Sequence, residues 1–153
     1  MIPVNQKYIH IEGQQAGDCW RACIASILEC EIEDFPILEN YDDWSDYYPK
    51  VLKVLDAKGW QLVGYTIENI NNPDILQAND TDGYVIAVGK SPRSTPEKRI
   101  NHAVVWKNGI VHDPHPDNTG LIEIIIFEIL IKKIVESTCD DTKLNEQKLS
   151  VNE

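Results

Sequence analysis

The 153-residue sequence predicts an α+β domain in which N-terminal helices pack against a C-terminal antiparallel sheet. Helical spacing of apolar residues dominates the part of the chain before Gly59. Beyond it, the apolar runs are rich in β-branched and aromatic residues, and Asn108-Gly109 is a typical hairpin turn between two of them. The length suits one domain, and a hydrophobic fraction of 42% is enough for a packed core.

The first helix is predicted to open near Asp18-Cys19 and to end near Glu29. Asp18 is the expected N-cap, and Gly17 allows a sharp turn into the helix. Its packing faces are made of small and apolar residues: Ala22, Cys23, Ala25, Ser26, Ile27 and Leu28. Such small side chains predict a buried, central helix.

A short turn over residues 32–38 precedes a second predicted helix, from about Trp44 to Lys58. Its apolar stripe consists of Val51, Leu52, Val54 and Leu55. Pro49 is a candidate for the true helix start, and Gly59 suits the C-terminal cap.

The remaining elements are predicted as strands at Trp60–Thr66, Gly83–Val88, His102–Trp106 and Ile110–His112. The last apolar run, Leu121–Val135, stays ambiguous. Three consecutive isoleucines within it favour a strand, whereas the spacing of its later apolar residues also suits a helix.

The formal net charge of −11 is concentrated in two segments. Residues 22–49 hold eight acids and no Lys or Arg, and residues 136–153 hold five acids and two lysines, so the rest of the chain is neutral. An acidic balance argues against binding to nucleic acid or to an anionic membrane surface. We expect one domain over residues 1–135 and a disordered acidic tail over residues 136–153. The N-terminus lacks the features of a secretory signal, so a cytoplasmic location with free thiols is expected.

Three residues have the chemistry of a nucleophilic site. Cys19 stands at the predicted start of a helix, where unpaired N–H groups and the helix dipole favour a thiolate. A thiolate nucleophile needs an imidazole to exchange its proton and a third group to hold that imidazole. His102 begins one strand of the predicted hairpin and Asp113 follows the other, so antiparallel pairing brings their levels together.

These residues stand in motifs that resemble the papain-like fold, and within it the bacteriocin-processing cysteine peptidases. The motifs run from Gln14 to Cys23, from Asn101 to Val105 and over Asp113-Pro114. The resemblance implies Cys19 as nucleophile, His102 as base and Asp113 as the orienting carboxylate. It also implies a glutamine that stabilises the oxyanion, with Gln14 favoured by position and Gln15 as its alternative.

The sequence also resembles small bacteriophage and bacterial proteins that share its cysteine helix, a His-Ala-Val-Val strand and a His-Asp-Pro-His-Pro segment, here residues 112–116. The resemblance covers roughly residues 14–121. It implies a cysteine hydrolase that cleaves a peptide, isopeptide or other amide bond without a cofactor, in the host cytoplasm if the gene belongs to a phage. Two alternatives stay open: a binding protein on the same fold, such as a phage-encoded modulator of host proteins, and an acyltransferase acting on small thiols or amines.

Other residues are assigned by position around this site. Trp20 follows the nucleophile and His115 follows the carboxylate, so both are candidates for substrate contact. The basic segment Lys90–Arg99 leads directly to His102 and is a candidate substrate-contacting loop. We expect the acids of residues 22–49 to point away from the thiol, which favours cationic substrates or partners.

A metal site is the competing interpretation of the cysteine and histidine clusters. Cys19 and Cys23 lack the short knuckle of a structural zinc site. One helical turn also does not easily aim both thiols and both histidines, His112 and His115, at one ion. No metal is therefore expected.

Overall fold

The computed structural model describes residues 1–66 and 80–134. The predicted acidic tail lies outside the described residues. The helices are α1 (Cys19–Leu28) and α2 (Trp44–Ala57), with short 3-10 turns at Ile32–Asp34 and Tyr41–Asp43. The strands are β1 (Trp60–Thr66), β2 (Val85–Lys90), β3 (Asn101–Trp106), β4 (Ile110–His112) and β5 (Glu123–Lys132). The predicted α+β class, with helices first and the sheet second, is confirmed.

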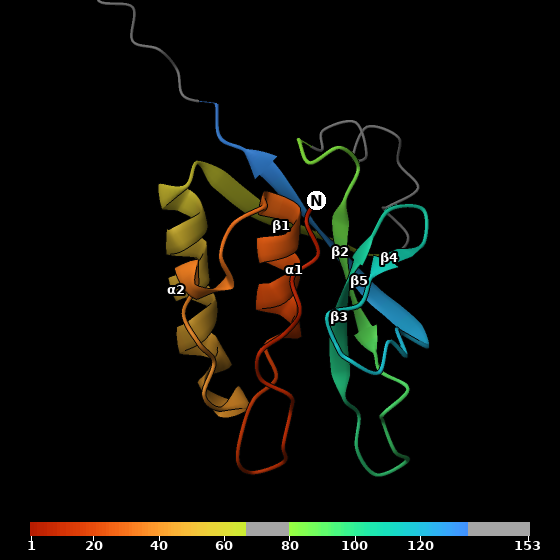
Figure 1. The fold of residues 1–153 in the computed structure, drawn as a ribbon. Helices are drawn as coiled ribbons and strands as arrows, with labels where there is room; N and C mark the ends of the chain where they lie inside the picture. The colour runs from red at the N-terminus through yellow and green to blue at the C-terminus, as the bar shows by residue number, and fades with distance from the viewer. Residues whose placement is uncertain (67–79, 135–153) are drawn as a thin grey trace, which may run out of the picture.

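The strands form one sheet in the order β1-β5-β2-β3-β4, and every neighbouring pair is antiparallel. The two helices lie side by side against this sheet (Figure 1). Helix α1 packs on β3 and β2, whereas α2 packs on β1. The N-terminal end of α1 is therefore held close to the strand that begins with Asn101-His102.

Helix α1 is the central helix that its small residues predict. Eight of its ten residues, 20–27, are buried, and the five residues 22–26 are fully inaccessible. Small side chains allow a close approach between the helix and the sheet. Asp18 is the N-cap residue, as predicted, but its side chain makes no capping hydrogen bond. Its carboxylate instead pairs with Arg21 and with the backbone of the N-terminal segment.

Helix α2 buries Tyr47, Val51 and Leu55 and is otherwise a surface helix. Pro49 lies inside the helix and not at its start. The 3-10 turn before the helix, in which the Asn40 side chain accepts the Asp42 N–H at 3.2 Å, leads directly into the first α-helical turn. The chain is thus already helical when it reaches the proline. None of the described helices is long and apolar enough to cross a membrane.

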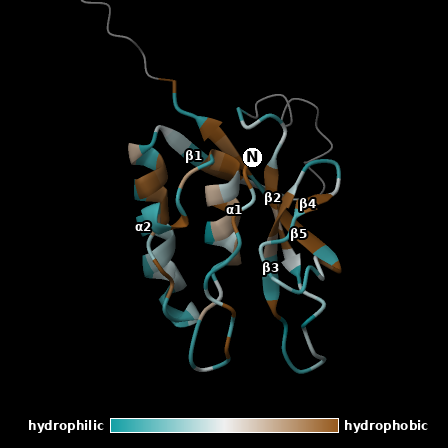
Figure 2. Cartoon of the chain, in the orientation of Figure 1, coloured by the Kyte–Doolittle hydropathy of each residue, from teal (hydrophilic) through white to brown (hydrophobic). Residues whose placement is uncertain are grey.

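The ambiguous run near the C-terminus is strand β5 through Lys132. It pairs with β1 on one side and β2 on the other, so its backbone groups are bonded in two ladders. Leu130 belongs to the apolar cluster under the helices, and its neighbour Ile129 belongs to a second cluster on the opposite face. The sheet core is brown, hence hydrophobic, along β5 (Figure 2). A strand with buried residues on both faces favours β-branched side chains, and the isoleucines of this run fit that position. The ambiguous run is therefore a strand and not a helix.

Candidate active site

The β3–β4 hairpin places His102 against Asp113. Its turn uses Asn108 and Gly109, both with positive φ, and the register pairs Val105 with His112. The chain continues past β4, and Asp113 Oδ1 lies 2.7 Å from His102 Nε2. Both side chains are almost inaccessible to solvent, at 2% and 4%. The structure thus brings together the imidazole and the carboxylate that the sequence pairs across the turn.

The Asp113 carboxylate is fixed from several directions. Its Oδ1 also accepts the His115 backbone N–H at 2.9 Å, and its Oδ2 accepts the Gly120 N–H at 2.8 Å. Burial raises the pKa of this carboxyl, but the hydrogen bond with His102 and the two N–H donors outweigh it and lower the pKa below the usual value. Asp113 therefore stays ionised and holds the His102 ring in one orientation.

The second group that interacts with His102 is Cys19, the first residue of α1. The two residues line the same pocket, and because Asp113 engages Nε2, the nitrogen left for the thiol is Nδ1. Burial lowers the pKa of His102, but the bonds with Asp113 and Cys19, together with their charges, raise it to about 9. The imidazole is accordingly held in its protonated form at neutral pH.

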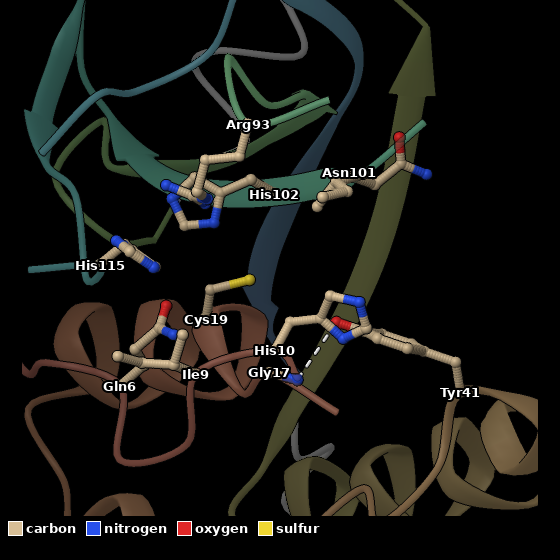
Figure 3. A pocket seen from close by; sticks show the side chains of 11 residues that line it. Gln6, Ile9, His10, Gly17, Cys19, Tyr41, Arg93, Asn101, His102 and His115 are labelled. Carbon is tan, nitrogen blue, oxygen red and sulfur yellow. Dashed lines mark hydrogen bonds between the residues drawn. The ribbon is translucent and has the colours of Figure 1, made fainter. Parts of the chain in front are cut away.

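Cys19 opens into a small pocket of about 70 Å³ (Figure 3). It is lined by Gln6, Ile9, His10, Gly17, Cys19, Tyr41, Arg93, Ile100, Asn101, His102 and His115. A larger hollow of about 470 Å³ adjoins it and shares four lining residues, among them His10 and Tyr41. An ion pair between Lys98 and Glu12, with 2.5 Å between the charged atoms, joins two segments that line this hollow. The thiol thus lies at the narrow end of a groove.

Gln14, the glutamine expected at the site, does not line the Cys19 pocket, whereas Gln6 does. Gln14 and Gln15 line a separate hollow, and the Gln15 amide donates to Ile9 O at 2.7 Å. Gln6 lines the Cys19 pocket instead, and its amide lies beside Cys19 in Figure 3. Its Nε2 donates to Tyr8 O at 3.0 Å, and its buried Oε1 has no hydrogen-bond partner among the described residues.

No sequence signal identifies Gln6. It lies in an irregular segment that reaches the site because the Gln6 backbone N–H donates to Pro114 O at 3.1 Å, beside Asp113. This contact spans more than one hundred residues of sequence. Neither periodicity nor a local motif predicts such a pairing.

Trp20 and His115, the two predicted substrate contacts, have different surroundings. His115 lines the pocket, with its ring 6.0 Å from the His102 ring and nearly perpendicular to it. Trp20 is only 7% exposed and is not among the described residues that line the pocket. It packs against aromatic residues of α2 and its Nε1 donates to Glu128. One position along a helix turns a side chain by about 100°, which here directs Trp20 into the core.

None of the eight acids in residues 22–49 is among the described residues lining the Cys19 pocket. Several are paired elsewhere: Glu29 with the N-terminal amine, Glu33 with Lys7, and Asp34 with Lys58 at 2.7 Å. The carboxylates of this negative block therefore do not line the pocket into which the thiol opens.

Cys23, Cys30 and His112 have structural surroundings. Cys23 is fully buried, and burial raises the pKa of its thiol well above the usual value. Cys30 is partly exposed, and burial is the main cause that raises its pKa. His112 Nε2 lies 2.9 Å from Val4 O and thereby ties the N-terminal segment to β4. Within residues 1–66 and 80–134, no group of three or more potential metal ligands is close enough to hold an ion.

No protein-family model matches this chain, and no curated protein or solved structure matches it either. The chemistry of the site is therefore argued from its own geometry. A thiol at a helix start lines one pocket with an imidazole, and this imidazole is hydrogen-bonded to an ionised carboxylate. This arrangement can hold a proton on the imidazole next to a sulfur nucleophile.

Proposed function

We propose that the protein is a cysteine hydrolase of papain-like fold that cleaves a peptide, isopeptide or other amide bond. The observation that supports this most is that Cys19 lines one pocket with His102, and that His102 is held by a buried carboxylate, Asp113, at 2.7 Å. The groove that ends at the thiol supplies the access that a substrate requires.

In the first step the Cys19 sulfur attacks the amide carbonyl carbon and a carbon–sulfur bond forms. The carbon–nitrogen bond then breaks, and the proton on His102 Nδ1 passes to the departing nitrogen, which leaves as an amine. Asp113 keeps the ring aligned and stabilises its protonated form. In the second step water attacks the thioester, His102 accepts a proton from it, and the acid and the thiolate are released.

The negative oxygen formed in each step needs hydrogen-bond donors. The backbone N–H of Cys19 supplies one, because the first N–H groups of a helix have no partner within the helix. The side-chain donor is Gln6 rather than Gln14, since Gln6 lines the pocket and its unpaired Oε1 leaves the amide free to rotate. The rotation exchanges the hydrogen bond to Tyr8 for one to the oxyanion.

The reactivity of Cys19 tests the activated thiol without a known substrate. Cys30 is the matched control in the same chain, because it is also partly exposed but lies away from His102. We expect iodoacetamide to alkylate Cys19 faster than Cys30 at pH 7, as read by mass spectrometry of peptides. We also expect Asp113→Asn to reduce this difference. Equal rates for the two thiols would falsify the proposal of an activated nucleophile.

Turnover of a peptide and amide library, followed by mass spectrometry, tests the reaction. Cys19→Ala should abolish turnover without unfolding the protein, and Asp113→Asn should lower kcat by on the order of 10²- to 10⁴-fold. Transfer of the acyl group to an added amine or thiol in preference to water would identify an acyltransferase. A biological effect that survives Cys19→Ala would identify a binding protein.

A further inference from the structure

The Cys19 pocket has a positive lining. Arg93 is the one permanently charged side chain among the described lining residues, and none of them is Asp or Glu. The other basic groups are the imidazoles of His10, His102 and His115. A pocket with this lining attracts an anion and disfavours a cation. The acids of residues 22–49, from which a cationic substrate is expected, do not reach it.

Arg93 is oriented by its neighbours and is not a free surface side chain. One guanidinium nitrogen, Nη1, donates to both carboxylate oxygens of Asp117 at 2.9 Å and to Thr119 Oγ1 at 3.1 Å. The Arg93 backbone N–H donates to Ser91 Oγ at 3.2 Å. Its side chain is 26% exposed. These contacts fix the plane of the guanidinium relative to the pocket.

The remaining edge of this guanidinium is available. Nε and Nη2 of Arg93 have no hydrogen bond to any residue that the structure describes. Two parallel N–H donors of this kind match the two oxygens of a carboxylate. Asp117, which holds the opposite edge, also pairs with His115 at 2.8 Å. One loop thus orients both Arg93 and His115 toward the pocket.

Arg93 and His115 lie on the His102 side of the pocket. The His102 and His115 rings are 6.0 Å apart, and Figure 3 shows both Arg93 and His102 on the side of the pocket that faces α1. In the proposed reaction His102 protonates the departing nitrogen, so the leaving group occupies this side. In an amino acid the carboxyl carbon is only two bonds from the nitrogen. A carboxylate so placed suits a pocket of about 70 Å³.

We propose that the substrate is an N-acyl amino acid or a peptide with a free C-terminus, and that Arg93 binds the carboxylate of the amino acid that leaves. This inference rests on the proposed hydrolase function and names its substrate class. Cys19 takes the acyl group as a thioester, the C–N bond breaks, and His102 transfers its proton to the amino group of the departing amino acid. Water then releases the acyl group as a carboxylic acid.

The first test needs no substrate. Iodoacetate and iodoacetamide differ by a carboxylate in place of a neutral amide, so the ratio of their alkylation rates reports anion binding near the thiol. We expect this ratio to be higher at Cys19 than at Cys30 by about tenfold or more, in line with a charge-assisted Arg contact. Arg93→Ala should reduce the Cys19 ratio to that of Cys30, and Arg93→Lys should give an intermediate value.

The second test uses pairs of peptides with a free or an amidated C-terminus and detects release of the last residue. We expect the free acids to have the higher kcat/KM in the native protein, and Arg93→Ala to remove the preference. Lys107→Ala is the control, because Lys107 is a base that pairs with Asp82 and lines neither the pocket nor the adjoining hollow. It should leave both ratios unchanged.

The outcomes separate this inference from the function on which it rests. If Cys19 is activated but both ratios are insensitive to Arg93, the carboxylate site is wrong and the hydrolase stands. If the alkylation ratio depends on Arg93 but amidated peptides are cleaved equally well, the anion site does not serve the leaving group and the substrate class is wrong. If Cys19 is no more reactive than Cys30, the hydrolase itself fails.

Discussion

Replacing Asp18 by Ala should strongly destabilise the protein, although Asp18 takes no part in the proposed chemistry. Its Oδ2 lies 2.8 Å from Arg21 Nη2, and both side chains are 2% exposed. Its Oδ1 accepts the backbone N–H groups of Lys7 and Tyr8, each at 2.9 Å. The substitution leaves a buried guanidinium without its counter-ion and two N–H groups without their acceptor.

Removal of one partner from a buried ion pair costs about 3–5 kcal/mol, because the other charge stays buried. A loss of this size is a large share of the roughly 5–15 kcal/mol by which domains are stable. It corresponds to a fall in Tm of about 10 °C for a chain of this length. Asp34 offers a matched control: it pairs with Lys58 at 2.7 Å, but both side chains are more than a third exposed. Asp34→Ala should cost at most about 1 kcal/mol.

Urea unfolding followed by circular dichroism measures these free energies. A double-mutant cycle uses the variants Arg21→Met, Asp18→Asn and their combination. We expect the double variant to lose less free energy of unfolding than the two single variants lose in sum. A cost below about 1 kcal/mol for Asp18→Ala would refute the reasoning, since an exposed pair costs as little. The reasoning would also be refuted if the losses of the two single variants added up to that of the double variant within about 0.5 kcal/mol, because independent sites show this agreement.

Three further predictions concern titration and the pocket. The pKa of His102 is raised from 6.5 to about 9, so the stability that its protonated form contributes is fully present below pH 6.5 and is lost as the pH rises through about 9. Free energies of unfolding measured at several pH values should fall by the order of 3 kcal/mol over this range, and Asp113→Asn should make the fall smaller. Burial raises the pKa of Glu128 against the opposing hydrogen bond from Trp20, so its ionisation costs stability as the pH rises; Glu128→Gln keeps an acceptor and should raise Tm at pH 8 by a few degrees, whereas an unchanged or lower Tm would contradict this. Gln6→Ala should lower kcat by about 10²-fold or more with little change in KM if Gln6 is the oxyanion donor, and an effect confined to KM would exclude that role.

The parts of the site that the sequence predicts depend on local signals. Asn108-Gly109 determines a hairpin because both residues adopt positive φ at little cost, and the pairing then fixes His102 opposite Asp113. Helix α1 begins at Cys19, and apart from Arg21 and Ser26 the residues that follow in the helix are small or apolar. Neither inference needs knowledge of distant parts of the chain.

The parts that it does not predict are brought in by long-range contacts of irregular segments. Gln6 reaches the pocket through a backbone bond to Pro114, and Arg93 reaches it through Asp117 and Thr119. The direction in which the Trp20 side chain points depends on the rotation of α1 about its axis, which here packs the indole against residues of α2. Composition and periodicity place residues on elements, but they do not fix how loops cross the ends of those elements.

Asp18 shows how a local rule and the tertiary structure compete at the site itself. A capping Asp18 would place its carboxylate over the first N–H groups of α1, beside Cys19, where a second negative charge opposes a thiolate. In the structure the carboxylate turns toward Arg21 and the N-terminal segment, and its charge is neutralised there. The positive end of the helix dipole is thereby left to the sulfur and to the oxyanion. The same pairing anchors the segment that carries Gln6, so one buried ion pair serves both the electrostatics and the assembly of the pocket.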